Sequence, residues 1–256
     1  MKNKILKSFL LICGLAVAGV VGWGAYIVLD YLGSSPRFEV RRVSVVGLKR
    51  VEVTQVLARA DLPDKANVFS VDLREIRERV EGLKWVRFAT VQRILPDTIG
   101  IKVVERQPIG LARIRGEILQ FDSEAELLDR DAGAGMNSPI LDGLEPGDSE
   151  RNKKKVDLYL RIMVDLHGQT ELSQIRIDDD LEVSVVSVNE PLLVHLGSDE
   201  FRTRWGQYLQ LRTRIQTDYP DAAQVDFRFA NQVILKMRQD APEEEKVVWD
   251  VEKKSL

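Results

Sequence analysis

A long apolar segment opens the chain. The 22 residues of Ser8–Leu29 carry no charge. At about 1.5 Å per residue, a helix of this length reaches ~33 Å, which exceeds the ~30 Å hydrocarbon core of a bilayer. Trp23, Tyr26 and Tyr31 collect toward its C-terminal end, where amphipathic rings favour the membrane interface. The pattern predicts a transmembrane helix over 9–32.

The flanking charges predict the orientation of this helix. The stub 1–8 holds three lysines and no acid, so it should stay in the cytoplasm while the bulk of the chain is exported. A cleaved signal peptide is the alternative, because Ala16–Ala18 forms an A-x-A pattern. Cleavage there would leave the apolar run Gly19–Leu29 exposed at a new N-terminus, so an uncleaved anchor is favoured.

Three small residues of the apolar segment share one helix face. Gly14, Ala18 and Gly22 follow one another at intervals of four residues. Such a face lets a second membrane helix approach closely, which predicts a packing surface. Small residues are also common in membrane spans in general, and both interpretations stay open.

After a linker at 33–37, the hydrophobic pattern of residues 38–108 predicts the order β-α-α-β-β. The expected elements are a strand at Phe38–Val46, helices at Glu52–Ala60 and Val71–Val80, and strands at Trp85–Ile94 and Thr98–Glu105. Asp72 is the expected N-cap of the second helix, and Gly82 its C-terminal stop. This order predicts a three-stranded sheet with both helices on one face and one edge open to a peptide strand.

Four segments of this region carry a family resemblance. They are the entry Phe38–Val40, the stop Val45–Gly47, the strand start Trp85–Val86 and the run Leu95–Pro108. That last run fits the pattern Pro-x-Thr-φ-x-φ-x-φ-x-Glu-Arg-x-Pro. Together they resemble the POTRA domain of the FtsQ/DivIB cell-division proteins, and the likeness extends over nearly the whole chain.

The region 109–238 is expected to form a mixed β-sheet domain with two helices. The predicted elements are a hairpin at Glu117–Phe121 and Glu126–Leu128, helices at Val156–Leu166 and Phe201–Thr217, strands at Leu172–Ile177, Leu181–Val188 and Leu192–Leu196, and a final hairpin. Ser138–Gly143, Leu196–Gly197 and Val225–Phe229 are similar to the motifs that the family places here. The whole chain is therefore predicted to be α+β.

The final hairpin is the most informative part of this region. Residues 225–229 alternate between apolar and charged side chains. In 233–238, Val233, Leu235 and Met237 alternate with Ile234, Lys236 and Arg238. We expect its outer strand to end the sheet, where unpaired backbone groups can accept a strand from a partner. The predicted partner-binding residues are Phe227, Arg228, Phe229, Val233, Ile234, Leu235 and Lys236, with Arg228 expected to pair with an acid of the partner.

The tail 239–256 is polar and mixed in charge, and Val247–Trp249 interrupts it with apolar residues. One interpretation is a loosely packed tail. The other is a short segment that extends the sheet or becomes ordered on a partner, which adds Val248 and Trp249 to the predicted partner-binding residues.

The composition excludes several classes of function. A net charge of −3 disfavours nucleic acid as a partner, and one Cys with two His excludes Cys-rich zinc sites and three-histidine metal centres. The sequence lacks a nucleophile elbow, a P-loop and a His-Glu-x-x-His pattern. His167 and His195 are expected to be structural, and Asp178–Asp180 to be an acidic turn. No catalytic residue, metal or cofactor is therefore predicted.

The family resemblance implies a function that composition does not give. It implies a non-enzymatic, single-pass scaffold of the bacterial divisome, held in the inner membrane at the septum with its bulk in the periplasm. It further implies partners of the FtsB/DivIC and FtsL type at the C-terminal edge, and recruitment through the POTRA domain. The alternatives are another POTRA-containing export or outer-membrane assembly factor and, less favoured, a membrane-tethered exported enzyme.

Overall fold

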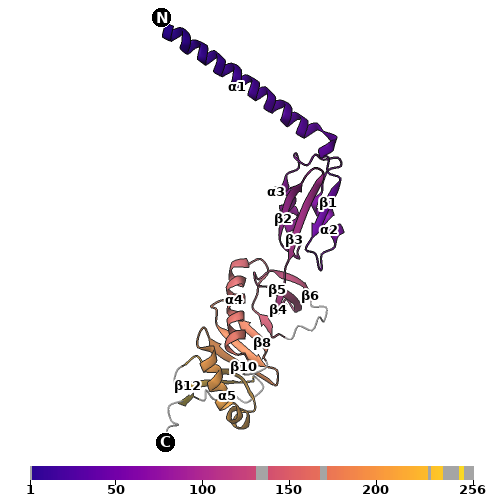
Figure 1. The fold of residues 1–256 in the computed structure, drawn as a ribbon. Helices are drawn as coiled ribbons and strands as arrows, with labels where there is room; N and C mark the ends of the chain where they lie inside the picture. Colours follow the sequence, from indigo (N-terminus) through magenta and orange to yellow (C-terminus); the bar gives the residue numbers. More distant parts are fainter. Residues whose placement is uncertain (1, 131–137, 168–171, 230–231, 239–247, 251–256) are drawn as a thin grey trace. The chain divides into compact units, whose positions relative to one another are not determined.

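The fold was examined in a computed structural model that describes residues 2–130, 138–167, 172–229, 232–238 and 248–250 (Figure 1). The chain forms two compact units, Met1–Arg106 and Gln107–Leu256. An N-terminal helix precedes a small sheet in the first unit, and the second unit combines a larger sheet with two helices. The predicted α+β fold is confirmed.

The N-terminal helix α1 spans Lys2–Ser34 and is followed by the short 3₁₀ helix η1 at Pro36–Phe38. Its segment Gly14–Ser34 is the one stretch, within the described part of the chain, that is long and apolar enough to cross a membrane. The large apolar side chains of this segment are exposed, as expected for a helix that packs in lipid rather than in a protein core. The helix extends beyond the predicted 9–32 at both ends.

The first unit has the predicted β-α-α-β-β order. Its elements are β1 (Arg42–Val46), α2 (Val53–Ala60), α3 (Leu73–Glu81), β2 (Val86–Ile94) and β3 (Thr98–Glu105). The sheet order is β1-β3-β2, in which β1 runs parallel to β3 and β2 antiparallel to it. A parallel pair at β1 and β3 requires a crossover between them, and α2 and α3 lie in that crossover.

Local sequence explains where these elements begin and end. The Asp72 carboxylate accepts hydrogen bonds from the backbone N–H groups of Arg74 (2.8 Å) and Glu75 (3.3 Å), so the predicted N-cap is confirmed. Gly47 ends β1 at φ +93°, where a Cβ atom would lie 2.0 Å from the carbonyl oxygen of Val103. Only glycine fits this position, which explains the stop after Val46.

The second unit is built on a ten-stranded mixed sheet. Its strands are β4 (Pro108–Ile114), β5 (Glu117–Asp122), β6 (Leu127–Arg130), β7 (Ile140–Asp142), β8 (Leu172–Ile177), β9 (Val183–Ser187), β10 (Glu190–Gly197), β11 (Ala222–Asp226), β12 (Gln232–Met237) and β13 (Val248–Asp250). They follow the order β13-β12-β11-β10-β9-β8-β7-β4-β5-β6. The helices are α4 (Ser149–Asp165) and α5 (Phe201–Asp218).

One hydrophobic core joins the two helices to one face of this sheet. Tyr159 of α4 and Trp205 of α5 belong to the same buried cluster as Val185, Val194 and Val225 of three neighbouring strands. Because side chains alternate along a strand, the residues next to these valines face the other side. The sheet is therefore apolar toward the helices and mixed in polarity on its opposite face.

Three details differ from the sequence-based expectation. Pro108 is the first residue of β4, which pairs with β5 and β7 of the second unit, although the sequence assigns Pro108 to the first domain. The strand predicted at Val225–Phe229 ends at Asp226. The Phe227 N–H still donates to the carbonyl of His195 on β10, which is the parallel-ladder bond of the His195–Asp226 pair. The predicted turn at Ala230–Asn231 lies outside the described residues.

Candidate partner-binding edge

Three short strands form the C-terminal end of the large sheet. In the antiparallel pair β11–β12, Val225 lies opposite Leu235 and Asp226 opposite Ile234. On the outer side of β12, β13 pairs antiparallel with it, from Gln232 opposite Asp250 to Ile234 opposite Val248. The expectation that the final hairpin ends the sheet is therefore wrong, because the chain's own tail covers the first half of β12. The alternative interpretation, in which the tail extends the sheet, agrees with this pairing.

The second half of β12 differs from the first. No strand pairs with Leu235–Met237 on the outer side among the residues that the structure describes, while β11 pairs with the same three residues on the inner side. The rest of the predicted tail, 239–247 and 251–256, lies outside the described residues. The outer edge of the sheet is thus the three-residue strand β13, which lies next to the six-residue strand β12.

Three of the predicted partner-binding residues have buried side chains. Phe227, Val233 and Leu235 are 2%, 3% and 4% exposed and belong to the main core. The Phe227 ring lies 6.1 Å from the Tyr208 ring in an edge-on contact. These side chains stabilise the sheet, so a partner can reach these residues only through their backbone.

The other predicted residues of the hairpin are accessible. Phe229 is 43% exposed, Lys236 is exposed and Ile234 is partly buried. Ile234 and Lys236 alternate with the buried Val233 and Leu235, so they occupy the face away from the helices. In β13, Trp249 lies opposite Val233 and Val248 opposite Ile234. The two predicted segments, separate in sequence, therefore meet at one edge.

Arg228 already has acidic partners within the chain. Its guanidinium binds the Asp226 carboxylate through Nε, 3.0 Å from each oxygen, and through Nη2 at 2.6 Å. Its Nη1 binds Glu182. Burial raises the pKa of Asp226, but the hydrogen bonds from Arg228 outweigh this and hold that pKa below its ordinary value. The carboxylate of Asp226 in turn raises the pKa of Arg228.

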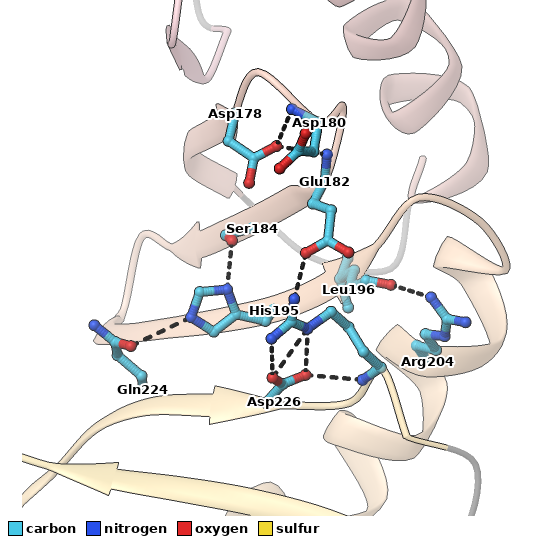
Figure 2. A network of polar contacts seen from close by, with 10 residues as sticks. Asp178, Asp180, Glu182, Ser184, His195, Leu196, Arg204, Gln224 and Asp226 are labelled. Carbon is cyan, nitrogen blue, oxygen red and sulfur yellow. Dashed lines mark hydrogen bonds and ion pairs between the residues drawn. The ribbon is translucent and has the colours of Figure 1, made fainter.

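A row of polar side chains crosses the sheet beside this pair (Figure 2). Ser184 of β9 and Asp226 of β11 are the strand partners of His195 on β10. The Ser184 hydroxyl lies 2.7 Å from His195 Nδ1, and Gln224 Oε1 lies 3.3 Å from His195 Nε2. Both ring nitrogens are therefore engaged, and His195 links three strands of the sheet, in keeping with the structural role expected for it.

A second polar cluster lies where α5 packs on the start of β10. The Tyr208 hydroxyl donates to Glu190, which also pairs with Arg212. Burial is the main cause that raises the pKa of Tyr208, and the hydrogen bond to Glu190 adds to it. Glu190 is buried at the start of β10, where the hydrogen bond from Tyr208 at Oε2 and the ion pair with Arg212 at Oε1 offset part of the cost of burying its charge.

The described residues contain no group of three or more His, Cys, Asp or Glu side chains arranged to hold a metal ion. The groups that this region offers include backbone N–H and C=O groups along β12 and β13, the exposed cations of Lys236 and Arg238, and the exposed ring of Phe229. Such an arrangement suits strand pairing with a peptide, in which the backbone supplies affinity and alternate side chains supply specificity.

The predicted packing face of α1 is also accessible. Gly14, Ala18 and Gly22 are exposed on the helix, and a Cβ atom at Gly14 or Gly22 would have nothing within 4 Å. This face can receive another helix without rearrangement of the chain.

Two features of the edge were missed by sequence reasoning. The pairing of Arg228 with Glu182 joins residues 46 positions apart, and no local pattern indicates it. The Asp226–Arg228 pair spans two positions of one predicted strand, but a bend after Asp226 is needed to bring the two side chains together. The alternation of charges in Val225–Phe229 was the available signal, and it was interpreted as a continuing strand.

Comparison with known proteins places this architecture. Residues 38–106 match the family model described as POTRA domain, FtsQ-type. The "Cell division protein FtsQ" of Koribacter versatilis is 30% identical over 250 residues, which cover 91% of this chain and 70% of that protein. The "Cell division protein FtsQ" of Syntrophotalea carbinolica is 25% identical over 238 residues, which cover 87% of this chain and 82% of that protein.

One solved structure is also similar. It is the major extracytoplasmic domain of the trans isomer of the cell division protein DivIB from Geobacillus stearothermophilus, with 16% sequence identity and a TM-score of 0.30. The match covers 44% of this chain and 97% of that domain.

Proposed function

The chain belongs to the FtsQ family of cell-division proteins, and from this premise we propose that it is a non-enzymatic, single-pass membrane scaffold of the divisome. The proposed role is to link and recruit septal proteins. The apolar helix α1 supports a membrane anchor, and the lysines of 1–8 support a cytoplasmic N-terminus with a periplasmic bulk. Family membership supports a place at the division septum.

We assign separate tasks to the two units. The stub 1–8, the span 9–32 and the linker 33–37 anchor the protein, the POTRA domain 38–108 guides recruitment to other septal proteins, and the β domain 109–238 with its tail binds partners. The proposed partners are division proteins of the FtsB/DivIC and FtsL type. Gly14, Ala18 and Gly22 would pack against a partner's membrane helix.

The pairing of β13 with only half of β12 is the observation that carries the proposed binding mode. A partner strand can pair along the whole outer side of β12, from Gln232 to Met237, if it takes the place of β13. It then forms more backbone hydrogen bonds than the three-residue strand that it replaces. Because Phe227, Val233 and Leu235 are buried, their role is to hold β12 in place.

A disulfide lock tests this exchange. In a Cys13→Ser background, which has no other cysteine, Ile234→Cys and Val248→Cys place two thiols on directly opposed residues of β12 and β13. We expect the oxidised double variant to lose pull-down of the FtsB- or DivIC-type subunit, and reduction to restore it.

The two single variants are the matched controls and should bind in both redox states. Equal partner binding by the locked and the reduced double variant would contradict the replacement of β13. Loss of binding counts for the exchange only if the cross-linked chain is folded by circular dichroism. Reduction of the same sample should then restore binding.

A further inference from the structure

A side-chain amide joins the loop between α2 and α3 to the end of α1. Asn67 Nδ2 donates to the carbonyl oxygens of Leu32 (2.8 Å) and Gly33 (2.9 Å) in the last turn of α1. Carbonyls in the last turn of a helix have no partner within the helix, so Asn67 satisfies two groups that would otherwise be left open. The backbone of Val68 also donates to Phe38, at 2.7 Å. The loop around Asn67 is therefore held against the end of α1.

The position of Asn67 along α1 sets its depth in a membrane. This step rests on the proposed function, in which α1 spans the bilayer and its uncharged run ends at Leu29, just before Asp30. At about 1.5 Å per residue, Leu32 and Gly33 lie ~5 to 6 Å beyond Leu29 along the helix axis. The headgroup layer is roughly 5 to 8 Å thick on each side. Asn67 then lies within the headgroup layer.

The strand topology brings a second segment to the same end of the sheet. β1 leaves the membrane helix through η1, and it pairs parallel with β3 so that Arg42 lies opposite Thr98. The turn between β2 and β3 must therefore lie at the end of the sheet where the chain enters. Two contacts hold it there: Arg41 N–H donates to Asp97 O (2.9 Å), and Arg93 Nε donates to Val68 O (2.7 Å).

This end of the first unit exposes apolar side chains. Leu95 is 57% exposed, Ile94 43% and Phe69 37%. A ladder of rings continues from α1 through Tyr31 and Phe38 to Phe69, with centroid distances of 6.5 and 5.1 Å. Aromatic and aliphatic side chains beside a membrane helix are favoured at the membrane interface, where their burial from water is favourable.

From these contacts we infer that the β2–β3 turn at Ile94–Pro96, together with Phe69, inserts into the outer interface of the bilayer that α1 crosses. The POTRA-type unit then has two membrane contacts, the span and this turn. Two contacts, with Asn67 between them, fix the orientation of the sheet relative to the membrane plane.

Depth-dependent fluorescence quenching tests the second contact in the full chain. In the Cys13→Ser background, Leu95→Cys is labelled with an environment-sensitive dye and reconstituted into vesicles of phosphatidylethanolamine and phosphatidylglycerol that contain a nitroxide lipid. Val46→Cys is the matched control, because Val46 is also apolar and exposed (53%) but lies at the far end of β1. Val20→Cys, in the middle of α1, reports the span itself.

The inference expects a blue-shifted, quenched dye at Leu95→Cys and an unquenched dye at Val46→Cys. A dye at Phe69→Cys provides a second position and should be quenched as well. If the Val20→Cys dye is quenched while those at positions 95 and 69 behave like the Val46→Cys dye, the inference is overturned and the membrane anchor stands. If the Val20→Cys dye is not quenched, the proposed anchor itself fails.

Discussion

Arg228 binds the carboxylate of Asp226, two residues before it, with Nε 3.0 Å from both carboxylate oxygens. The Arg228 backbone N–H also donates to the same carboxylate, at 2.9 Å. Side chain and backbone thus close a tight bend at the end of β11, and the bend turns the chain away from its strand partner. This pair decides where β11 ends and leaves Arg228 bound within the chain.

The Asp226–Arg228 pair predicts a pH-dependent contribution to stability. We expect Asp226→Asn to lower the free energy of unfolding by about 1 to 2 kcal/mol at neutral pH, because it removes charge-assisted hydrogen bonds at a partly buried site. The native pKa of Asp226 is lowered, so its contribution is present above the unfolded value of ~3.9 and is lost as the pH falls through the native pKa. Urea unfolding of both chains as a function of pH measures the difference.

Asp199→Asn is the control for that experiment, because the Asp199 carboxylate that pairs with Arg204 is largely exposed. Its effect should stay within about 0.5 kcal/mol. An Asp226→Asn variant as stable as the control at neutral pH would contradict the assigned role of the bend.

Glu105 predicts a similar effect in the first unit. Its carboxylate accepts hydrogen bonds from the backbone N–H groups of Lys49 (2.8 Å), Arg50 (3.0 Å) and Val51 (2.9 Å). Burial raises the pKa of Glu105, but these three donors outweigh it and keep the pKa below its ordinary value. We expect Glu105→Gln to cost about 1 to 2 kcal/mol of stability.

The lowered pKa also fixes the pH range of this effect. The Glu105 contribution is present above the unfolded pKa of ~4.3 and disappears as the pH falls through the native pKa. Thermal unfolding of the two chains at a series of acidic pH values should therefore converge. Glu78→Gln, which alters an exposed ion pair with Arg74, is the comparison and should change little at any pH.

The buried carboxylate of Glu190 predicts strong coupling with Tyr208. Tyr208→Phe leaves Glu190 with one partner fewer in the core, so we expect a loss of about 1 to 3 kcal/mol. Glu190→Gln removes the charge that the tyrosine serves, and the double variant should lose less than the sum of the two single changes. A double-mutant cycle by urea unfolding measures this coupling, and strict additivity would rule it out.

The proposed strand exchange predicts that backbone groups of β12 matter more than exposed side chains. Ile234→Pro and Lys236→Pro each remove one backbone N–H of β12, the strand with which the partner would pair, and we expect either change to abolish pull-down of the FtsB- or DivIC-type subunit. Circular dichroism should show that the chain remains folded.

Lys236→Ala is the matched control for the proline variants. It removes the exposed cation but keeps the N–H, so binding should persist with a modest loss. Binding that survives both prolines but disappears in Lys236→Ala would mean that a charge contact, and not strand pairing, holds the partner.

Much of the fold could be predicted from the sequence because its signals are local. The uncharged run of α1 specifies a membrane-length helix, and Asp72 satisfies backbone groups only two and three residues away. Gly47 permits a backbone angle that other residues avoid. In the first unit, alternation and helical spacing therefore indicated the β-α-α-β-β elements and their order, but not the 3₁₀ helix η1.

The candidate edge depended on contacts between distant segments. The alternation in Val225–Phe229 predicted a strand, but it does not indicate that the Phe227 N–H bonds to His195 on β10, over 30 residues away. The pairing of Arg228 with Glu182 is equally remote in sequence. The free energy of such contacts depends on chain closure and packing, which a local pattern does not encode.

By itself, the sequence determined a membrane anchor, a β-α-α-β-β unit and a mixed sheet with two helices, because periodicity and caps act over one or two turns of chain. Only the tertiary structure decided which strand lies outermost, which of the predicted edge residues are buried, and which loop contacts the end of α1. Those outcomes require β13 to find β12 and Asn67 to find Leu32 in space. They follow from backbone groups that must be paired once they are removed from water.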